Sequence, residues 1–379
     1  MAIWDIKERN KIVRANEFRG QQALFGGGNS GSDSNVIDYI DITALGDAVD
    51  YGDLSVARKN TCATGNIVRG FWGGGYDPVF SNAIDSVFFK SKGNAADFGN
   101  LVSVVHRLAS GGNKIRGIFG GGEAPGDDPG SSSGYTNSIT YLVLASAGNS
   151  ADFGDLSGRR SDVVAAGSPT RLVFGGGHEE SGKKNIIEYI TIASTGNTTD
   201  FGDLSSARTV PAAVSSTTRA IYAGGDTGVA PAAVNTMDYI TIATTGDDTD
   251  FGDLSEARKG ADGGSNNTRA VFGGGNTTND ALNTSNVIDY VTIASTGDAA
   301  DFGDLTSART RAGGASNGHG GLGEDEGYFF QRPSVTYMPG SGRGIFGGGY
   351  TPTIIKKIDV INIQTLGNAS DFGDLSQNL

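Results

Sequence analysis

The chain has 379 residues, and its 61 glycines lack the every-third-residue period of collagen. With 29 basic and 42 acidic side chains the net charge is -13, which argues against a general affinity for nucleic acid or anionic membranes. A single cysteine cannot form an internal disulfide, and no apolar run approaches the length of a membrane span, so we expect a fold held by burial and hydrogen bonds.

The N-terminal segment contains charged residues where a signal peptide would need an apolar stretch, so we expect a soluble chain made in a cytoplasm. Residues 1–9 precede the first repeat and are predicted to be an arm or a latch, with Trp4 as a candidate partner contact. The following segments "KIVRANEF" and "GQQALFGGG" are predicted to be the first two strands of the first repeat.

The rest of the chain repeats itself. A glycine triplet, or "AGG" in one case, occurs seven times, and "DFGDL" or a close variant follows each copy. A period of about 40 to 50 residues is typical of a propeller or a solenoid. The triplets begin at residues 26, 73, 120, 175, 223, 273 and 347.

Residues 253–304 illustrate one repeat. A run of small residues after "LSEAR" predicts strand a, "TRAVF" strand b, "NVIDYVTIA" strand c and "DFGDL" strand d. Strand c is apolar on both faces, and strand a has the small side chains that suit the crowded axis of a propeller. The sequence therefore predicts an all-β, seven-bladed β-propeller over residues 10–379, with four antiparallel strands in each contiguous blade.

The Asp-Phe-Gly tripeptide also occurs in protein kinases. The chain lacks the glycine-rich loop, the strand lysine and the catalytic loop that accompany it there. We expect the phenylalanine to pack between blades, the glycine to permit a close approach or a bulge, and the aspartates to end turns.

The order of these features resembles the kelch repeat, over nearly the whole chain. The resemblance implies a kelch-like propeller. The residues that carry it in one repeat are Phe272, Gly273, Gly274, Tyr290, Phe302, Leu305, Ala308 and Arg309.

A narrower resemblance concerns the segment "IDYVTIASTGDAADFGDL", which is similar to repeat arrays in virion and tail-fibre-like proteins of tailed phages, especially marine ones. This resemblance implies a non-enzymatic virion protein of the tail, fibre or capsid exterior, acting in assembly or host-surface attachment through its loops. Its partners would be other virion proteins and a host-surface glycan or protein, with no cofactor, nucleic acid or membrane insertion. The alternatives are a carbohydrate-binding propeller and a polysaccharide hydrolase.

Arginines and carboxylates recur in every repeat, and they predict either structural pairing or a repeated ligand site. One arginine set opens strand b. A second set ends the "LSxAR" segment, at Arg58, Arg107, Arg159, Arg208, Arg258 and Arg309. Carboxylates recur in strand c, at Asp38, Asp85, Glu188, Asp238, Asp289 and Asp359.

Candidate chemistry is sparse. The turn at residues 245–253 is rich in carboxylates, but it lacks the calcium-loop spacing, which leaves a bound cation as an open alternative. His106, His178 and His319 have no metal-ligand spacing and are expected in loops or at the surface. Cys62 is expected to be a buried, inert thiol. We therefore predict no catalytic, cofactor or metal residues.

The loops between strands b and c differ in every repeat and are expected on one face, where loops on a rigid scaffold carry binding. The last repeat has an apparent insertion at about residues 318–340 between strands a and b, on the opposite face. Its aromatic residues would either plug the channel and cover a blade edge, or contact a partner. These partner-binding candidates are Tyr328, Phe329, Phe330 and Tyr337.

Overall fold

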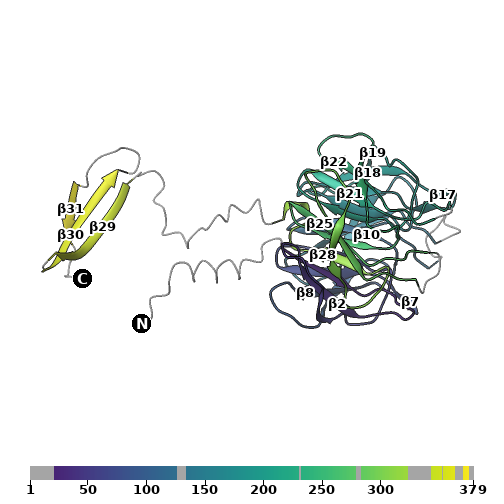
Figure 1. The fold of residues 1–379 in the computed structure, drawn as a ribbon, viewed down its shortest axis with the longest axis horizontal. Coiled ribbons are helices and arrows are strands. Elements are labelled where there is room, and N and C mark those ends of the chain that lie inside the picture. Colours follow the sequence, from purple (N-terminus) through teal and green to yellow (C-terminus); the bar gives the residue numbers. More distant parts are fainter. Residues whose placement is uncertain are drawn as a thin grey trace. The chain divides into compact units, whose positions relative to one another are not determined.

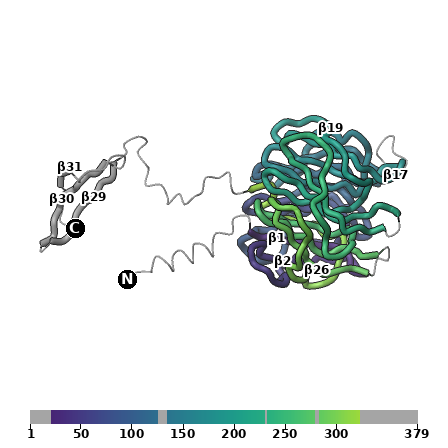
Figure 2. The backbone as a smooth tube through the Cα atoms, turned by 45° about the horizontal axis from the view of Figure 1, so that its top comes forward, coloured from purple at the N-terminus to yellow at the C-terminus, as the bar shows by residue number. Residues whose placement is uncertain are grey.

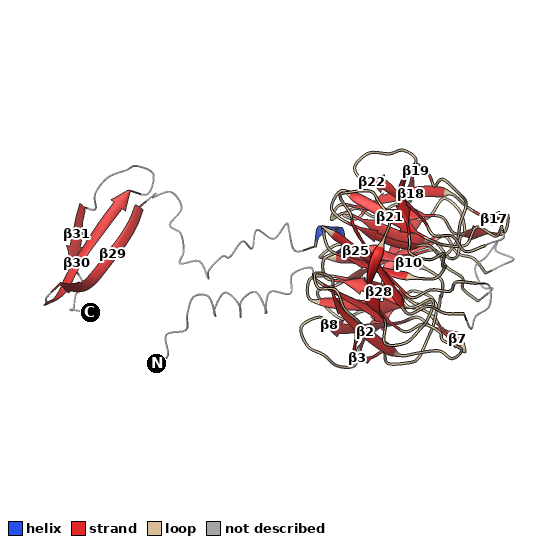
Figure 3. Cartoon of the chain, in the orientation of Figure 1, coloured by secondary structure: helices blue, strands red, loops and turns tan. Residues whose placement is uncertain are grey.

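The computed structural model describes residues 21–125, 134–229, 232–278, 283–322, 343–351, 353–362 and 370–374. It divides into two compact units, residues 1–326 and 327–379, which are described separately (Figure 1). Strands form nearly all of the regular structure in the described residues, with one short 3-10 helix (Figure 3).

The first unit contains six four-stranded antiparallel sheets, which we call blades 1 to 6. Strands a of blades 1 to 6 are β28 (Gly313–Ser316), β4 (Cys62–Gly65), β10 (Ala109–Gly112), β14 (Val164–Gly167), β20 (Ala212–Ser215) and β24 (Asp262–Ser265). Strands b are β1 (Gln22–Gly26), β5 (Arg69–Gly73), β11 (Arg116–Gly120), β15 (Arg171–Gly175), β21 (Arg219–Ala223) and β25 (Arg269–Gly273). Strands c are β2 (Val36–Asp41), β8 (Ala83–Phe88), β12 (Ser138–Val143), β18 (Ile186–Thr191), β22 (Thr236–Thr241) and β26 (Val287–Thr292). Strands d are β3 (Val49–Asp53), β9 (Ala96–Asn100), β13 (Ala151–Asp155), β19 (Thr199–Asp203), β23 (Thr249–Asp253) and β27 (Ala300–Asp304).

The ring closes after six blades, so the predicted number of seven is wrong. Strand β28 comes from the end of the unit and pairs with β1 from its beginning, in the register Ala23↔Ser316 to Gly26↔Gly313. Figure 2 shows the purple start of the unit beside its green end. Blade 1 is therefore not contiguous in sequence, which corrects a second expectation. The segment "KIVRANEF", predicted as its strand a, lies outside the described residues.

The seventh copy of the repeat forms a separate three-stranded sheet in the second unit. Its strands are β29 (Arg343–Thr351), β30 (Thr353–Asn362) and β31 (Ser370–Asp374). The register of β30 against β31 shifts between Ile358 and Asp359. The same shift occurs in each blade of the ring, for example between Ile187 and Glu188. This sheet thus repeats strands b, c and d of a blade.

The Asp-Phe-Gly segment forms strand d, and its glycine permits the approach of the next blade. At Gly154 the φ angle is +149°, and a Cβ atom would lie 2.3 Å from the carbonyl oxygen of Gly196 in the following blade. No L side chain fits there, because real Cβ atoms do not approach a carbonyl so closely. The predicted structural role of this glycine is confirmed.

The hydrophobic core consists of six clusters, and each lies between two adjacent blades. In the cluster between blades 3 and 4, the ring of Phe153 packs edge-on against Tyr141 at a centroid distance of 6.0 Å. One cluster joins blades 6 and 1 through Val271 and Phe25. The ring is consequently a closed series of equivalent interfaces, with no edge left between its first and last blades.

Buried ion pairs join five of the six blade interfaces. Arg258, which precedes blade 6, lies 2.8 Å from Asp289 in strand c of that blade, and neither side chain is exposed to solvent. Every pair links the "LSxAR" arginine to the strand-c carboxylate of the next blade, which confirms the structural interpretation. The pairs are Arg58–Asp85, Arg160–Glu188, Arg208–Asp238, Arg258–Asp289 and Arg309–Asp38.

Two members of the predicted arginine set were misassigned. Arg160, not Arg159, occupies the paired position. In blade 3 that position is Val105, and the strand-c carboxylate is replaced by Thr140; both residues line a small cavity of about 20 Å³. Arg107 lies two residues further along and belongs to a different structure, described below.

The strand-b arginines also stabilise the ring. The Arg171 guanidinium stacks over the ring of Tyr189, 4.1 Å from its centroid, and donates to the carbonyl oxygen of Ile242 in the next blade at 2.8 Å. Arg116, Arg219 and Arg269 repeat both contacts with their own neighbours. The arginines that open strand b are therefore structural as well.

Candidate functional site

A closed ring of main-chain hydrogen bonds surrounds the axis at one end of the propeller. In each blade, the residue two positions before strand a donates its N–H to the carbonyl oxygen of the equivalent residue in the preceding blade, over 2.8 to 3.2 Å. All six residues have φ between +47° and +62°, and five of them are the only non-glycine residues with positive φ in the described residues. This axial ring consists of Asn60, Arg107, Asp162, Val210, Gly260 and Arg311.

The strand b to c loops lie at the same end. In each blade, the first residue after the glycines forms a bridge with the residue that precedes the axial ring, as in His178 with Ser161 and Asp226 with Thr209. The two short hairpins β6–β7 (Tyr76–Asp77, Val79–Phe80) and β16–β17 (His178–Glu179, Gly182–Lys183) belong to these loops. We call this end the axial face. Its loops share one face, as predicted.

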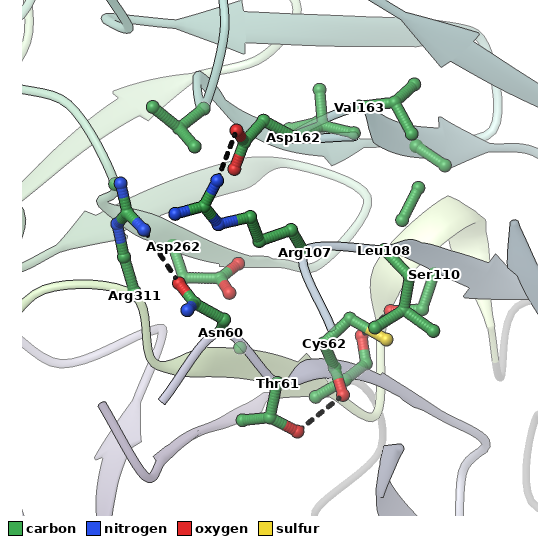
Figure 4. A pocket seen from close by; sticks show the side chains of 18 of the residues that line it. Asn60, Thr61, Cys62, Arg107, Leu108, Ser110, Asp162, Val163, Asp262 and Arg311 are labelled. Carbon is green, nitrogen blue, oxygen red and sulfur yellow. Dashed lines mark hydrogen bonds and ion pairs between the residues drawn. The ribbon is translucent and has the colours of Figure 1, made fainter. Parts of the chain in front are cut away.

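The axial ring surrounds the mouth of a cavity of about 110 Å³. This axial cavity is lined by all six strand-a segments, with apolar side chains such as Leu108, Val163 and Pro211 on its walls. Its polar lining groups come from the axial ring at the mouth and from the strands a further along the axis (Figure 4). The same fold position thus supplies five different residue types from six blades.

Two arginines stand at the mouth of the axial cavity. The Arg107 guanidinium lies 3.4 Å from Glu123 and 3.7 Å from Asp162. The Arg311 guanidinium donates to the side-chain oxygen of Asn60 at 3.0 Å, as Figure 4 shows. Burial lowers the pKa of Arg311, Asp162 opposes this shift, and the nearby charge of Arg107 adds to it. The charge of Arg107 is therefore close enough to disfavour the protonated form of Arg311.

A carboxyl group and a thiol lie deeper in the cavity. Burial raises the pKa of Asp262 to about 7, against hydrogen bonds from the N–H groups of Gly263 and Gly314. Burial also raises the pKa of Cys62 to about 12, so the thiol is protonated at neutral pH, as expected for an inert cysteine. Asp262 therefore offers either a proton donor or an acceptor to a ligand near neutral pH.

His106 lies beside the axial ring, in the loop between β9 and β10 as expected, but it is buried and not at the surface. Its two ring nitrogens lie 3.3 Å from Asn60 and 3.3 Å from Glu123. Burial and the charge of Arg107 lower the pKa of the imidazole to about 4. The neutral ring thus lies against the two side chains that in turn contact the two arginines.

At the end of the propeller axis opposite the axial face lies the 3-10 helix η1 (His319–Gly321). Nδ1 of His319 lies 2.7 Å from the carbonyl oxygen of Ser316, and a Cβ on Gly320 would lie 2.5 Å from the carbonyl oxygen of Gly167. In Figure 3 this helix is on the left of the propeller, whereas β7 and β17 are on the right. The start of the predicted insertion thus lies opposite the axial face.

The predicted partner contacts fall where the structure gives no description. Trp4, Tyr328, Phe329, Phe330 and Tyr337 all lie outside the described residues. Within the described residues there is no cluster of three His, Cys, Asp or Glu side chains suited to a metal ion, and no helix is long and apolar enough to cross a membrane.

The carboxylates of the turn at residues 245–253 cap strand d of the preceding blade. Asp247 accepts a hydrogen bond from the N–H of Asp203 at 3.0 Å, and Asp248 accepts one from the N–H of Ser205 at 3.0 Å. The equivalent Asn197 makes the same contact with Asp155 at 3.0 Å. A neutral amide serves as well as a carboxylate, which indicates a structural role for this turn.

Asn60, Asp162, Asp262 and Arg311 were not among the site residues predicted from the sequence. The available signal was variation at a fixed position, two residues after the "LSxAR" arginine, where Asn, Arg, Asp, Val, Gly and Arg follow one another. Aligning the repeats on the buried arginine, rather than on the glycines, would have exposed that position.

Fold and site together define a six-bladed β-propeller with a charged cavity on its axis. Comparison of the chain with models of known protein families and with curated proteins finds no match.

Proposed function

We propose that this chain is a non-enzymatic recognition propeller that binds its partner through the axial face. The observation that carries the proposal is the axial ring, where one repeated backbone conformation presents six positions with five different residue types. Elsewhere the repeat keeps its side chains because they hold the blades together, as the buried ion pairs do. A position that keeps its backbone but varies its side chain suits recognition rather than architecture.

The surrounding loops support the same face. Val79 and Val229, at the tips of two strand b to c loops, are 68% and 73% exposed. Exposed apolar side chains on a rigid loop scaffold can be buried by a partner. The β-propeller fold is compatible with both protein and carbohydrate partners, and fold alone does not select between them.

The setting of this function rests on the resemblance of the repeats to those of tailed-phage virion proteins. On that basis the proposed location is the exterior of a virion, in the tail, a fibre or the capsid. The partner there would be another virion protein or a host-surface glycan or protein. The strongly acidic composition, with a net charge of -13, is compatible with such a partner and disfavours nucleic acid.

The test is binding of the purified chain to intact host cells, to virions lacking it and to an array of surface glycans. The double variant Val79→Ser and Val229→Ser should weaken binding to the true partner by about tenfold, since each exposed valine that a partner buries contributes on the order of 1 kcal/mol. The matched control is the double variant Val68→Ser and Ile115→Ser. These two side chains are 47% and 56% exposed, and they lie in turns between strands a and b, at the other end of the ring.

The proposal predicts that the axial-face variant loses affinity while the control variant keeps it. Equal losses, or a loss in the control variant alone, would contradict the assignment of this face. Circular dichroism melting of both variants excludes unfolding as the cause.

A further inference from the structure

The charges of the axial cavity differ from those elsewhere in the protein. Each buried arginine between blades has at least one carboxylate partner, and in Arg309–Asp38 the separation is 2.5 Å. Arg311 is partly buried too, but among the described residues its guanidinium donates only to the uncharged side chain of Asn60. It forms no ion pair with a carboxylate in that part of the chain. A partly desolvated guanidinium without a counter-ion is unfavourable.

Neighbouring carboxylates act on this charge only from a distance. Asp162 and Glu123 are within ion-pair distance of Arg107, not of Arg311. Asp226, which also acts on Arg311 from a distance, already binds the ammonium groups of Lys183 and Lys259. Arg107 therefore has two carboxylates within ion-pair distance, whereas the Arg311 guanidinium has none among the described residues, and a bound carboxylate would give it a direct counter-ion.

The shape of the site limits the anion. A guanidinium presents a planar pair of donors that matches a carboxylate. The cavity of about 110 Å³ has room for a small organic acid, since a water molecule occupies about 30 Å³ of liquid. Below the arginines, the carboxyl group of Asp262 and the hydroxyl of Ser110 line the wall and can bond to hydroxyl groups. The acidic neighbours Asp162 and Glu123 disfavour an anion with two charges.

We propose that the axial cavity binds the carboxylate of a small hydroxylated acid of the sugar-acid class. Arg311 is the counter-ion of the carboxylate and Arg107 its second donor, while the ligand hydroxyls point toward Asp262 and Ser110. This inference rests on the proposed function, because the ligand enters through the axial face. It specifies the chemistry at the centre of that face: an acidic sugar, free or at the end of a glycan.

The test is isothermal titration of the full chain with sodium D-glucuronate, with D-glucose, acetate and inorganic phosphate as comparison ligands. We expect glucuronate to bind at least tenfold more tightly than each of the others. The variant Arg311→Gln keeps a donor for Asn60 but removes the charge, and it should weaken glucuronate binding at least tenfold. Asp162→Asn removes a neighbouring negative charge, and it should tighten binding several-fold.

The control is Lys90→Gln, which removes one positive charge from an exposed turn between β8 and β9 and should leave the affinity unchanged. Equal binding of glucose and glucuronate, tighter binding of phosphate, or unchanged binding by Arg311→Gln would each overturn the inference. Acetate binding as tightly as glucuronate would overturn its sugar part. An oligosaccharide that ends in glucuronate, titrated beside the free acid, distinguishes a glycan from a free ligand.

Failure of this inference is separable from failure of the proposed function. If no acid binds while the axial-face valine variant still loses its partner, only the cavity assignment is wrong. If glucuronate binds as expected while that valine variant keeps its partner, the recognition face is wrong and the cavity assignment stands.

Discussion

At the scale of single residues, the axial ring places side chains in a conformation that most of them avoid. Left-handed backbone costs an L-residue about 1–2 kcal/mol, and asparagine, aspartate and glycine tolerate it best. Asn60, Asp162 and Gly260 follow this preference, whereas Arg107, Val210 and Arg311 do not. The closed hydrogen-bond ring enforces the conformation at every position, so the two arginines are retained there against their own backbone preference.

Val210 permits a direct test of this strain. Its φ is +47°, and a β-branched side chain is especially unfavourable there. We expect Val210→Asn to raise the free energy of unfolding by about 1 kcal/mol, because asparagine accepts left-handed backbone at lower cost. Chemical denaturation measures the change.

The opposite substitution in the same ring is the control. Gly260→Ala should lower the free energy of unfolding by about 1 kcal/mol or more, because φ is +62° and the new Cβ would lie 2.6 Å from the hydroxyl of Thr310. If Val210→Asn destabilises the protein as much as Gly260→Ala does, the ring is not strained at Val210.

At the scale of elements, the "LSxAR" segment fastens each blade to the next. In blade 6, the Asp289 carboxylate accepts from the N–H of Ser255 at 3.1 Å and from Arg258 at 2.8 Å. Arg258 also donates to the carbonyl oxygens of Val287 and Phe272. Blade 3 replaces this arrangement as a unit: the N–H of Val102 donates to Ser150, and Val105 and Thr140 occupy the positions of the ion pair. The chain thus contains two versions of the same blade interface, one with a buried ion pair and one without.

This natural exchange predicts how the ion pair responds to mutation. Arg258→Val alone leaves Asp289 buried without its counter-ion and should cost about 3–5 kcal/mol of unfolding free energy. Adding Asp289→Thr reproduces the blade 3 pair and should recover part of that loss, because the isolated buried charge is gone. Denaturant unfolding of both single variants and the double variant measures the coupling. A double variant less stable than Arg258→Val would contradict this account.

At the scale of the whole molecule, the sequence allowed the class of fold but not the number of blades to be predicted. Strands a to d, the structural role of the Asp-Phe-Gly segment and the shared face of the variable loops follow from short patterns, because each blade imposes the same local packing. The predicted number was wrong because the glycine triplet, counting one "AGG", occurs in seven copies, whereas in the described residues six segments link a strand d to a following strand a. Pairing of β28 with β1 joins residues far apart in sequence, and no local pattern encodes it.

The same long-range pairing predicts where the propeller can be shortened. A chain ending at Glu326 keeps β28 and η1, and it should melt at the same temperature as the ring in the full chain. A chain ending at Ala312 lacks β28, so the edge of β1 and the indole N–H of Trp72, which donates to Gly313 at 2.9 Å, lose their partners. An unpaired edge and an open ring favour aggregation.

We therefore expect this shorter chain to lack a cooperative melting transition by calorimetry and to elute as aggregates from a sizing column. Both chains lack residues 327–379, so only β28 and its immediate continuation distinguish them. Equal melting temperatures for the two chains would show that the ring does not depend on its closing strand.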